Sequence, residues 1–339
     1  MKARVGALLS IVLLLAIPVI GSMSARAELL TVLPTPDYMV DITSAIRSAS
    51  KSIFAAFFFV EPYSTNTVIN ELANAKARGV AVKLVVSTHS LVYYSGVKER
   101  LTELGIPFRI ATNHAKVVVI DDSLLYIGSA NWNMNGLQNN MELTYKSRNT
   151  AAISEAKGYI NTLWSTGKTS VKYTAAMAEQ PVNGQEYVDQ VISLLKNAKT
   201  SIKFSMYEVV YDFKNPSSAQ SKLLWELKNA YQRGVDVQIV LDNPRYYEHP
   251  AGANFLAKYK IPHKIDAQTF GPLEKKHMKA FLIDDKILVI GSHNWNSDSA
   301  NSSNEYSIIV RGNADANREF NAWFAPIWNT GIWVIAPSQ

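Results

Sequence analysis

The second half of this 339-residue sequence repeats the first half, and this repetition limits what the chain can fold into more than any other feature. The tripeptide Arg-Gly-Val stands at 78–80 and again at 233–235, in each case before a stretch rich in β-branched residues. Trp-Ser-Thr-Gly at 164–167 recurs as Trp-Asn-Thr-Gly at 328–331. A chain made of two copies of one unit is expected to fold as two similar layered units.

Both copies contain the same order of expected elements. The expected helices are 38–49, 65–78, 186–198 and 218–233, and the expected strands are 52–60, 82–86, 201–210 and 237–241. The second helix of each copy ends at Gly79 or Gly234, a residue type that readily takes the left-handed conformation that closes a helix. Strands that alternate with helices predict the α/β class, with a mainly parallel sheet covered by helices.

The repeats divide the chain into segments. We expect a first repeat at 28–170, a polar linker at 171–184 and a second repeat at 185–339. Residues 1–27 are typical of a signal peptide, because a basic start and an apolar run at 5–20 lead to Ala-Arg-Ala at 25–27. The run is shorter than the roughly 20 residues that a membrane-spanning helix needs. We therefore expect an exported protein, secreted or extracytoplasmic, with an uncleaved N-terminal anchor as the alternative to cleavage.

Composition excludes several kinds of chemistry. The chain has no cysteine, which rules out disulfides, thiolate zinc sites and a cysteine nucleophile. The formal net charge of +6 falls to +3 without residues 1–27, because three basic side chains are lost with that segment. A surplus this small does not by itself predict binding to nucleic acid, which usually requires a clustered basic face.

A set of polar residues recurs at one constant distance. In the first half these residues are His114, Lys116, Asp121, Gly128, Ser129, Asn131 and Glu142, and in the second half they are His277, Lys279, Asp284, Gly291, Ser292, Asn294 and Glu305. Each member of the second set lies 163 positions after its counterpart. Because side chains alternate along a strand, the histidine and the lysine of each set should project to the same side. One histidine, one lysine and one asparagine from each half would then meet at a common point.

Two H-x-K-x4-D motifs, each followed by G-S-x-N, resemble the pattern of the phospholipase D superfamily. Each half is similar to the compact bacterial endonucleases of that superfamily, which carry one motif per chain and form dimers. The resemblance covers nearly the whole chain after residue 27. It implies two phospholipase D-like α/β/α repeats, related by a pseudo-twofold axis, with one active site shared between them.

The resemblance also implies a mechanism. His114 would attack phosphorus and form a covalent phosphohistidine, while His277 would protonate the leaving oxygen and then activate water or an acceptor alcohol. In members of the superfamily with two motifs, the N-terminal histidine is usually the nucleophile, and the two roles are assigned on that basis. The residues alone leave the assignment open. No metal and no cofactor are expected, because the histidines supply the nucleophile and the lysines supply positive charge.

The remaining motif residues receive supporting roles. Lys116 and Lys279 would neutralise phosphate oxygens, whereas Asn131, Asn294, Ser129 and Ser292 would bind the phosphate through polar groups. Glu142 and Glu305 match the family acid that holds the distal ring nitrogen of the histidine and fixes its tautomer. Asp121 and Asp284 should order turns beyond a buried strand and not touch substrate.

Several other residues have simpler interpretations. His89, His249, His263 and His293 lack a repeated context and are expected to be ordinary surface or supporting residues. The run 57–59, Phe-Phe-Phe, is expected to pack in the core, and Trp132 and Trp295 are expected to pack beneath the site. The tyrosine pairs at 93–94 and 246–247 could stack on bases, contact lipid or cap the core.

The expected activity is hydrolysis of a phosphodiester. We favour an exported phospholipase D acting on glycerophospholipids, and the alternative is an exported, metal-independent nuclease that cleaves DNA or RNA. A cardiolipin synthase-like transferase and a non-catalytic binding module rank lower, the latter because neither half has lost its histidine or lysine. The expected partners are the phosphodiester substrate, phospholipid or nucleic acid, and a peripheral membrane contact. With both half-sites in one chain, we expect a monomer without an obligate protein partner.

Overall fold

The computed structural model describes residue 27 and the ranges 29–267, 275–301 and 304–335. The predicted signal peptide therefore lies outside the described residues, apart from Ala27, which is buried. Within the described ranges, no helix is both long and apolar enough to cross a membrane.

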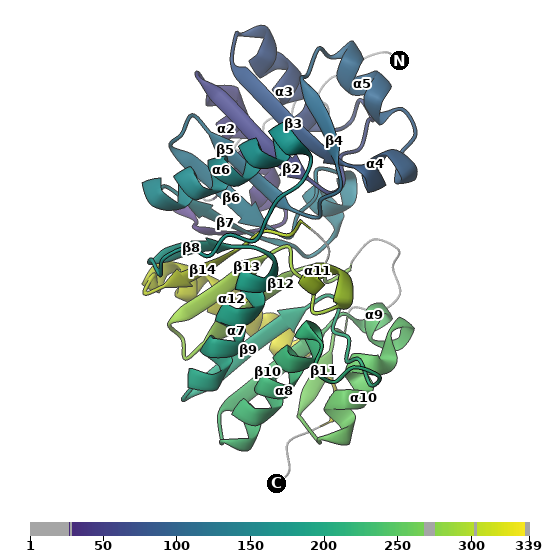
Figure 1. The fold of residues 1–339 in the computed structure, drawn as a ribbon, viewed down its shortest axis with the longest axis vertical. Coiled ribbons are helices and arrows are strands. Elements are labelled where there is room, and N and C mark those ends of the chain that lie inside the picture. Colours follow the sequence, from purple (N-terminus) through teal and green to yellow (C-terminus); the bar gives the residue numbers. More distant parts are fainter. Residues whose placement is uncertain (1–26, 28, 268–274, 302–303, 336–339) are drawn as a thin grey trace, which may run out of the picture.

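Two mixed β-sheets, one from each repeat, form the centre of the molecule (Figure 1). The strands of the first sheet are β1 Val32–Pro34, β2 Ser52–Phe57, β3 Ala81–Ser87, β4 Phe108–Ala111, β5 Lys116–Ile120, β6 Leu124–Gly128 and β7 Leu143–Ser147, in the order β1-β7-β6-β5-β2-β3-β4. The strands of the second sheet are β8 Glu179–Val182, β9 Ser201–Met206, β10 Asp236–Leu241, β11 His263–Ile265, β12 Lys279–Ile283, β13 Ile287–Gly291, β14 Ser307–Arg311 and β15 Ile332–Ile335, in the order β15-β11-β10-β9-β12-β13-β14-β8.

The prediction of mainly parallel sheets was wrong. In the first sheet only β2, β3 and β4 pair in parallel, whereas β5, β6 and β7 pair antiparallel, and the second sheet follows the same plan. The reason is local. The turns after β5 and β12 return the chain at once, and a tight turn can join only antiparallel neighbours. The parallel strands are joined by helices, by α3 between β2 and β3 and by α8 between β9 and β10.

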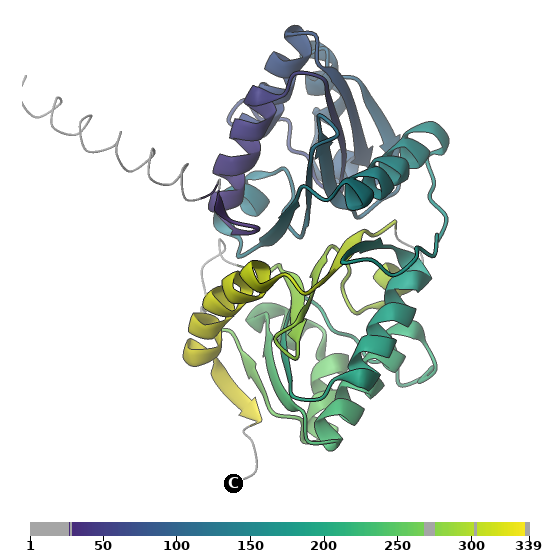
Figure 2. The same ribbon diagram turned by 90° about the vertical axis from the view of Figure 1, so that its left-hand side faces the viewer.

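Helices cover both faces of each sheet, which gives the α/β/α layering that the resemblance implied (Figure 2). The helices of the first repeat are α2 Asp37–Ser48, α3 Thr67–Ala77, α4 Thr88–Tyr93, α5 Val97–Glu103, the π-helical turn η1 Asn135–Asn139, and α6 Thr150–Thr166. Those of the second repeat are α7 Gly184–Asn197, α8 Ala219–Gln232, α9 Asn243–Glu248, α10 Pro250–Lys258, α11 Ser297–Asn301 and α12 Ala314–Thr330. Within the expected linker, residues 179–182 form β8 and join the edge of the second sheet.

One hydrophobic cluster contains buried residues of both repeats. Leu125, Ile127 and Tyr145 of the first sheet lie in the same buried cluster as Ile290 and Ile308 of the second. The ends are also joined, because the carboxylate of Glu319 in α12 accepts hydrogen bonds from the backbone N–H groups of Thr31 and Val32 at 3.0 and 2.8 Å. This packing fixes the position of each motif relative to the other.

Candidate active site

The two motif histidines lie immediately before central strands of the two sheets, at the junction between the repeats. His114 precedes β5 and His277 precedes β12. The backbone N–H of His114 donates to the carbonyl of Asn304 at 3.0 Å, and that of His277 donates to the carbonyl of Met141 at 3.1 Å. Each histidine is therefore anchored to the other repeat, at the residue that precedes the other repeat's acid.

As a result, the acids and the histidines are paired across the two repeats. His114 Nδ1 lies 2.8 Å from Glu305 Oε1, and His277 Nδ1 lies 2.8 Å from Glu142 Oε1. Both carboxylates are almost completely buried. Each half of the site thus consists of a histidine from one repeat and an orienting acid from the other.

The charges of these pairs fix the tautomer of each histidine. Burial would raise the pKa of Glu305, but the charge of His114 and the hydrogen bond to it outweigh burial and lower this pKa to about 2. For Glu142, His277 likewise outweighs burial and lowers the pKa. An ionised carboxylate can only accept hydrogen bonds, so Nδ1 of each histidine carries the proton. Burial lowers the pKa of both histidines, that of His277 to about 4, and this leaves Nε2 of each neutral ring as an unprotonated nitrogen.

The motif lysines lie next to the histidines that they follow in sequence. Lys116 Nζ donates to the carbonyl of His114 at 2.6 Å, and Lys279 donates to the carbonyl of His277. Both side chains are buried, and burial lowers the pKa of Lys116 to about 7 and that of Lys279 to about 8. An anionic phosphate in the site would favour the protonated form of both amines.

The asparagines and serines of the two motifs have different surroundings. Asn294 lines the cleft, and its buried Oδ1 has no hydrogen-bond partner among the described residues. Asn131 uses its Oδ1 to accept from the backbone N–H of Phe59 at 3.2 Å. The two serines are completely buried. Ser292 donates to the carboxylate of Glu305, and Ser129 donates to the carbonyl of Leu143 at 3.3 Å. The Ser292 hydroxyl therefore supports Glu305, and the Ser129 hydroxyl supports the backbone next to Glu142. Binding of phosphate by these serines stays a prediction.

The motif aspartates lie away from the cleft, at the far end of the strands. Asp121 and Asp122 both have positive φ, as do Asp284 and Asp285, and aspartate tolerates this region better than most residues do. The Asp121 carboxylate accepts the N–H groups of residues 50–52 at 2.7 to 2.8 Å. Asp284 accepts the N–H groups of residues 199–201 at 2.7 to 3.1 Å. Each aspartate thus closes a turn and fixes the start of β2 or β9.

A cleft of about 340 Å³ exposes both histidines. It is lined by Phe58, Phe59, His89, Thr112, Asn113, His114, Tyr207, Glu208, Arg245, His277, Asn294, Asn296, Asp298, Ser299 and Glu305. The core-packing prediction for 57–59 holds only for Phe57, because β2 ends there and the next two side chains turn into the cleft.

The sequence interpretation missed a repeated pair of aromatic residues at the histidines. The ring of Phe58 meets that of His114 edge-on at 4.4 Å between centroids, and Tyr207 meets His277 in the same way at 4.6 Å. Both aromatics immediately follow the last residue of their strand, β2 or β9. Alignment of the two strands would have revealed this pair.

The next position along the chain breaks the symmetry of the cleft. Phe59 of the first repeat corresponds to Glu208 of the second. Glu208 pairs with Arg245 of α9 at 2.9 Å, accepts a hydrogen bond from Asn296, and lies 3.7 Å from Nδ1 of His249. One side of the cleft is therefore aromatic and the other side is charged.

Two of the remaining histidines, and the two tryptophans that follow the motif asparagines, have structural surroundings. His89 lines the cleft beside Phe58. His263 and His293 are buried and hydrogen-bonded within the second repeat. Trp132 and Trp295 are fully buried and donate to the hydroxyls of Tyr38 and Tyr187, both at 3.0 Å. In the described ranges, no group of three histidine, aspartate or glutamate side chains is arranged to hold a metal ion.

This arrangement can carry out two-step transfer at phosphorus. Two neutral imidazole rings present Nε2 to one cleft, so one ring can attack phosphorus while the other, once protonated, protonates the leaving oxygen. Two buried ammonium groups lie beside them, where low polarity strengthens their attraction for a phosphate. These residues supply nucleophile, proton and charge within one site.

Comparisons with known proteins agree on one family. The family described as "Cardiolipin synthase, PLD-like domain" matches residues 42–164 and 191–328. Phospholipase D Z of Dictyostelium discoideum is 20% identical over 323 residues, which cover 78% of this chain and 75% of that protein. The 5'-3' exonuclease PLD3 of Xenopus laevis is 21% identical over 294 residues, which cover 68% of this chain and 59% of that protein.

A solved structure gives the same fold over both repeats. The phosphatidylserine synthase of Haemophilus influenzae Rd KW20 superposes with a TM-score of 0.70 over 93% of this chain and 92% of that one, at 12% identity. This likeness concerns the arrangement of the two repeats, because the sequences have diverged far.

Proposed function

The chain belongs to the phospholipase D superfamily and is a phosphodiesterase, and from this premise we propose that it is an exported phospholipase D that acts on glycerophospholipids. In this proposal His114 forms the phosphohistidine and His277 serves as acid and then as base. Export rests on the sequence of residues 1–27. The choice of lipid rests on the shape and polarity of the cleft.

The difference between the two sides of the cleft carries the proposal. A glycerophospholipid has an apolar glycerol ester on one side of its phosphate and a polar head group on the other. A nucleic acid strand has sugar and base on both sides. The cleft offers Phe58 and Phe59 on one side and Glu208 with Arg245 on the other, which matches the lipid better.

The aromatic side continues into an exposed apolar rim. The ring of Phe59 lies 5.1 Å from that of Tyr93, whose side chain is 70% exposed, and the neighbouring Val92 is 89% exposed. Tyr63, which is 55% exposed, packs edge-on against Tyr94. Large apolar and amphipathic side chains at the mouth of a site suit contact with the interfacial region of a bilayer.

The charge of the cleft also favours lipid over a polyanion. Among the described residues that line it, Arg245 is the only lysine or arginine, and it is neutralised by Glu208 at 2.9 Å and Glu248 at 3.1 Å. A groove that follows a nucleic acid backbone needs basic side chains for the phosphates that flank the scissile one. The two motif lysines can serve one phosphate group.

The charged side is where the head group would leave. In an in-line displacement the leaving oxygen lies opposite the nucleophile, on the side of the acid. With His114 as nucleophile, the leaving alcohol would sit near His277, Glu208 and Arg245. A polar or charged alcohol fits these surroundings, and the retained glycerol ester would then lie toward the aromatic side.

A two-substrate assay in EDTA tests the proposal. The purified protein is incubated with vesicles of phosphatidylcholine and phosphatidylglycerol and, separately, with plasmid and single-stranded DNA, and His114→Ala serves as the blank. We expect release of head group from the vesicles and intact DNA. Cleavage of DNA without release of head group would overturn the lipid assignment and leave the phosphodiesterase mechanism in place.

Nuclease activity is the second candidate, and one observation favours it. Tyr93 and Tyr247 are exposed in corresponding helices, α4 and α9, where aromatic rings could stack on bases. The relative from Xenopus laevis is named an exonuclease. The DNA arm of the assay decides between the two candidates.

A further inference from the structure

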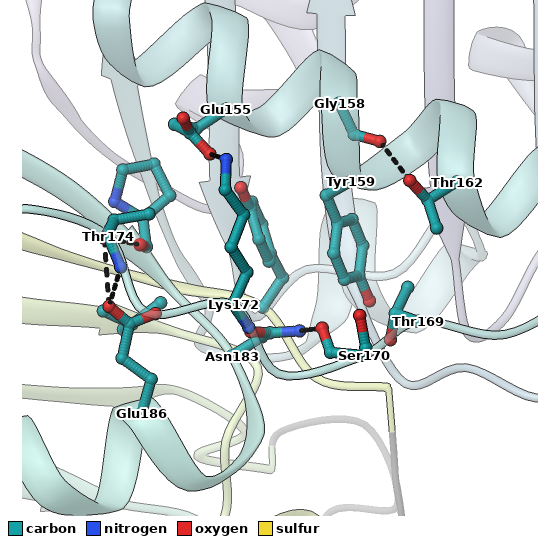
Figure 3. Close-up of a pocket in the computed structure, with 13 residues that line it drawn as sticks. Glu155, Gly158, Tyr159, Thr162, Thr169, Ser170, Lys172, Thr174, Asn183 and Glu186 are labelled. Atoms are coloured by element: carbon teal, nitrogen blue, oxygen red, sulfur yellow. Dashed lines mark hydrogen bonds and ion pairs between the residues drawn. The ribbon is translucent and has the colours of Figure 1, made fainter.

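A second cavity, of about 180 Å³, lies between α6, residues 169–174, β8 and the start of α7 (Figure 3). It shares no lining residue with the catalytic cleft. Both repeats contribute to it, because α6 belongs to the first and α7 to the second. From its lining we propose that this cavity binds a small organic ammonium ion.

The first observation is a buried carboxylate oxygen without a partner. Glu186 of α7 is 1% exposed and lines the cavity. Its Oε1 accepts from the backbone N–H of Thr174 at 2.7 Å, from the hydroxyl of Thr174 at 3.0 Å and from Gln180 at 3.3 Å. Its Oε2 is buried and accepts no hydrogen bond from any described residue. An orphaned buried carboxylate oxygen is costly, and a bound donor would remove that cost.

The second observation concerns the sign of the charge. The charged residues of the lining are Glu155, Lys172 and Glu186, and Glu155 and Lys172 neutralise each other through an ion pair of 2.6 Å. Glu186 is left as the acidic group without a basic partner in the lining. Burial raises its pKa, and a bound cation would oppose this effect and favour the ionised carboxylate. A ligand that carries a donor and a positive charge fits this lining, whereas an anion does not.

The third observation is the shape and polarity of the walls. The rings of Tyr159 and Tyr306 are stacked at 4.1 Å and line the cavity together with Pro181 and Val182. Aromatic faces attract cations as well as short alkyl groups. Figure 3 shows Tyr159 on the α6 side of the cavity and Glu186 on the α7 side. The ligand would place its ammonium group at Glu186 and its carbon chain against the rings.

The fourth observation is a glycine in the lining of the cavity. Gly158 lies in the interior of α6, where glycine is unfavourable compared with alanine. A Cβ atom built at this position meets no heavy atom within 4 Å, so close packing does not require glycine there. A large side chain at this position would obstruct the cavity that Gly158 lines.

Titration of the full protein with n-butylammonium chloride by isothermal calorimetry tests the proposal, and an identical titration with sodium chloride controls for ionic strength. We expect one site with a dissociation constant on the order of 1 mM, and no binding of sodium butyrate. Glu186→Gln, which removes the negative charge at nearly constant volume, should weaken binding about 10-fold or more. Gly158→Trp should do the same by placing a large side chain against the cavity that this residue lines.

Gly158→Ala is the matched control, because it improves the helix but adds only one methyl group. It should bind within about twofold of the wild type, and all three variants should keep a cooperative melting transition. Absence of saturable binding to the wild type would overturn the proposal. So would equal affinity in the wild type and Glu186→Gln, because the ammonium ion would then bind elsewhere.

Discussion

Each motif histidine is held by an acid of the other repeat. The two half-sites can therefore be tested separately, by substituting one acid at a time. The ring nitrogen of His114 is held by Glu305, 191 positions away, and that of His277 by Glu142, 135 positions away. Because the acids are ionised, they keep Nδ1 protonated and Nε2 free for chemistry. Substitutions in one repeat are therefore expected to act on the histidine of the other.

His114→Ala and His277→Ala should each lower kcat by about 10³-fold or more, since nucleophile and proton donor are both required. His277→Ala should also accumulate phosphohistidine at His114, because the base that activates water is missing. Steady-state assays and mass spectrometry of the quenched protein measure both effects. Full activity in either variant would exclude a shared site.

Glu305→Gln should change the ring NMR signals of His114 and leave those of His277 unchanged. The carboxylate raises the pKa of the His114 ring, so its removal should lower that pKa further. Glu142→Gln is the matched variant and should affect His277 alone. Each should lower kcat by about 10²-fold. A response of the histidine in the same repeat would contradict the crossed pairing.

The pH dependence of kcat/KM should report the buried lysines. Burial lowers the pKa of Lys116 to about 7 and that of Lys279 to about 8. The lysines attract phosphate only when protonated, so kcat/KM should fall as pH rises through this range. Initial rates with a soluble phosphodiester from pH 5 to 10 measure it. A kcat/KM that stays level up to pH 10, as the ordinary lysine pKa of 10.5 would give, would disagree with burial of these amines.

At the scale of elements, the hairpin turns after β5 and β12 fix the starts of β2 and β9, the strands that lead toward the site. The two aspartates of each turn are adjacent but differ in their contacts. Asp121 accepts three backbone N–H groups at the start of β2, whereas Asp122 makes one ion pair with the partly exposed Lys157 at 2.7 Å. Both aspartates contact another element, but only Asp121 binds the backbone at the start of a strand.

Asp121→Asn should lower the free energy of unfolding by about 2 kcal/mol, because it weakens charge-assisted hydrogen bonds to the backbone. Asp122→Asn is the control and should cost less than about 0.5 kcal/mol, since asparagine also tolerates positive φ and the ion pair is exposed. Urea unfolding measures both.

Burial would raise the pKa of Asp121, but the hydrogen bonds outweigh it and lower that pKa below its ordinary 3.8. The stabilisation should therefore be present above pH 3.8 and be lost as pH falls through the folded pKa. Equal losses in the two variants would show that the hydrogen bonds from Asp121 to the backbone stabilise the fold no more than the exposed ion pair of Asp122 does.

At the scale of the whole molecule, one chain supplies both halves of the site. Buried residues of both sheets form one cluster, and hydrogen bonds from His114 and His277 cross between the repeats. A second chain is not needed to complete the cleft. We predict that specific activity is independent of protein concentration and that light scattering gives the mass of one chain. Activity that is lost on dilution together with a change in mass would show that a dimer is the active form.

Much of the molecule follows from short-range patterns in the sequence. Helices α3 and α8 end within a residue or two of the expected positions, because the glycines after them favour left-handed closure. The recurrence of seven residues at one offset placed both motifs in equivalent local structures. Alternation along strands and the chemistry of tight turns were enough to separate the histidines from Asp121 and Asp284, because these are properties of neighbouring residues.

The tertiary structure decided the contacts that no local spacing encodes. The packing of the two sheets pairs His114 with Glu305 and His277 with Glu142, and the fold of the second repeat places Arg245 beside Glu208. It also places Phe58 and Phe59 together on one side of the cleft. The two histidine–acid pairs depend on how segments more than a hundred positions apart meet. That is set by the burial of a core shared between the repeats, and repetition in sequence alone does not specify it.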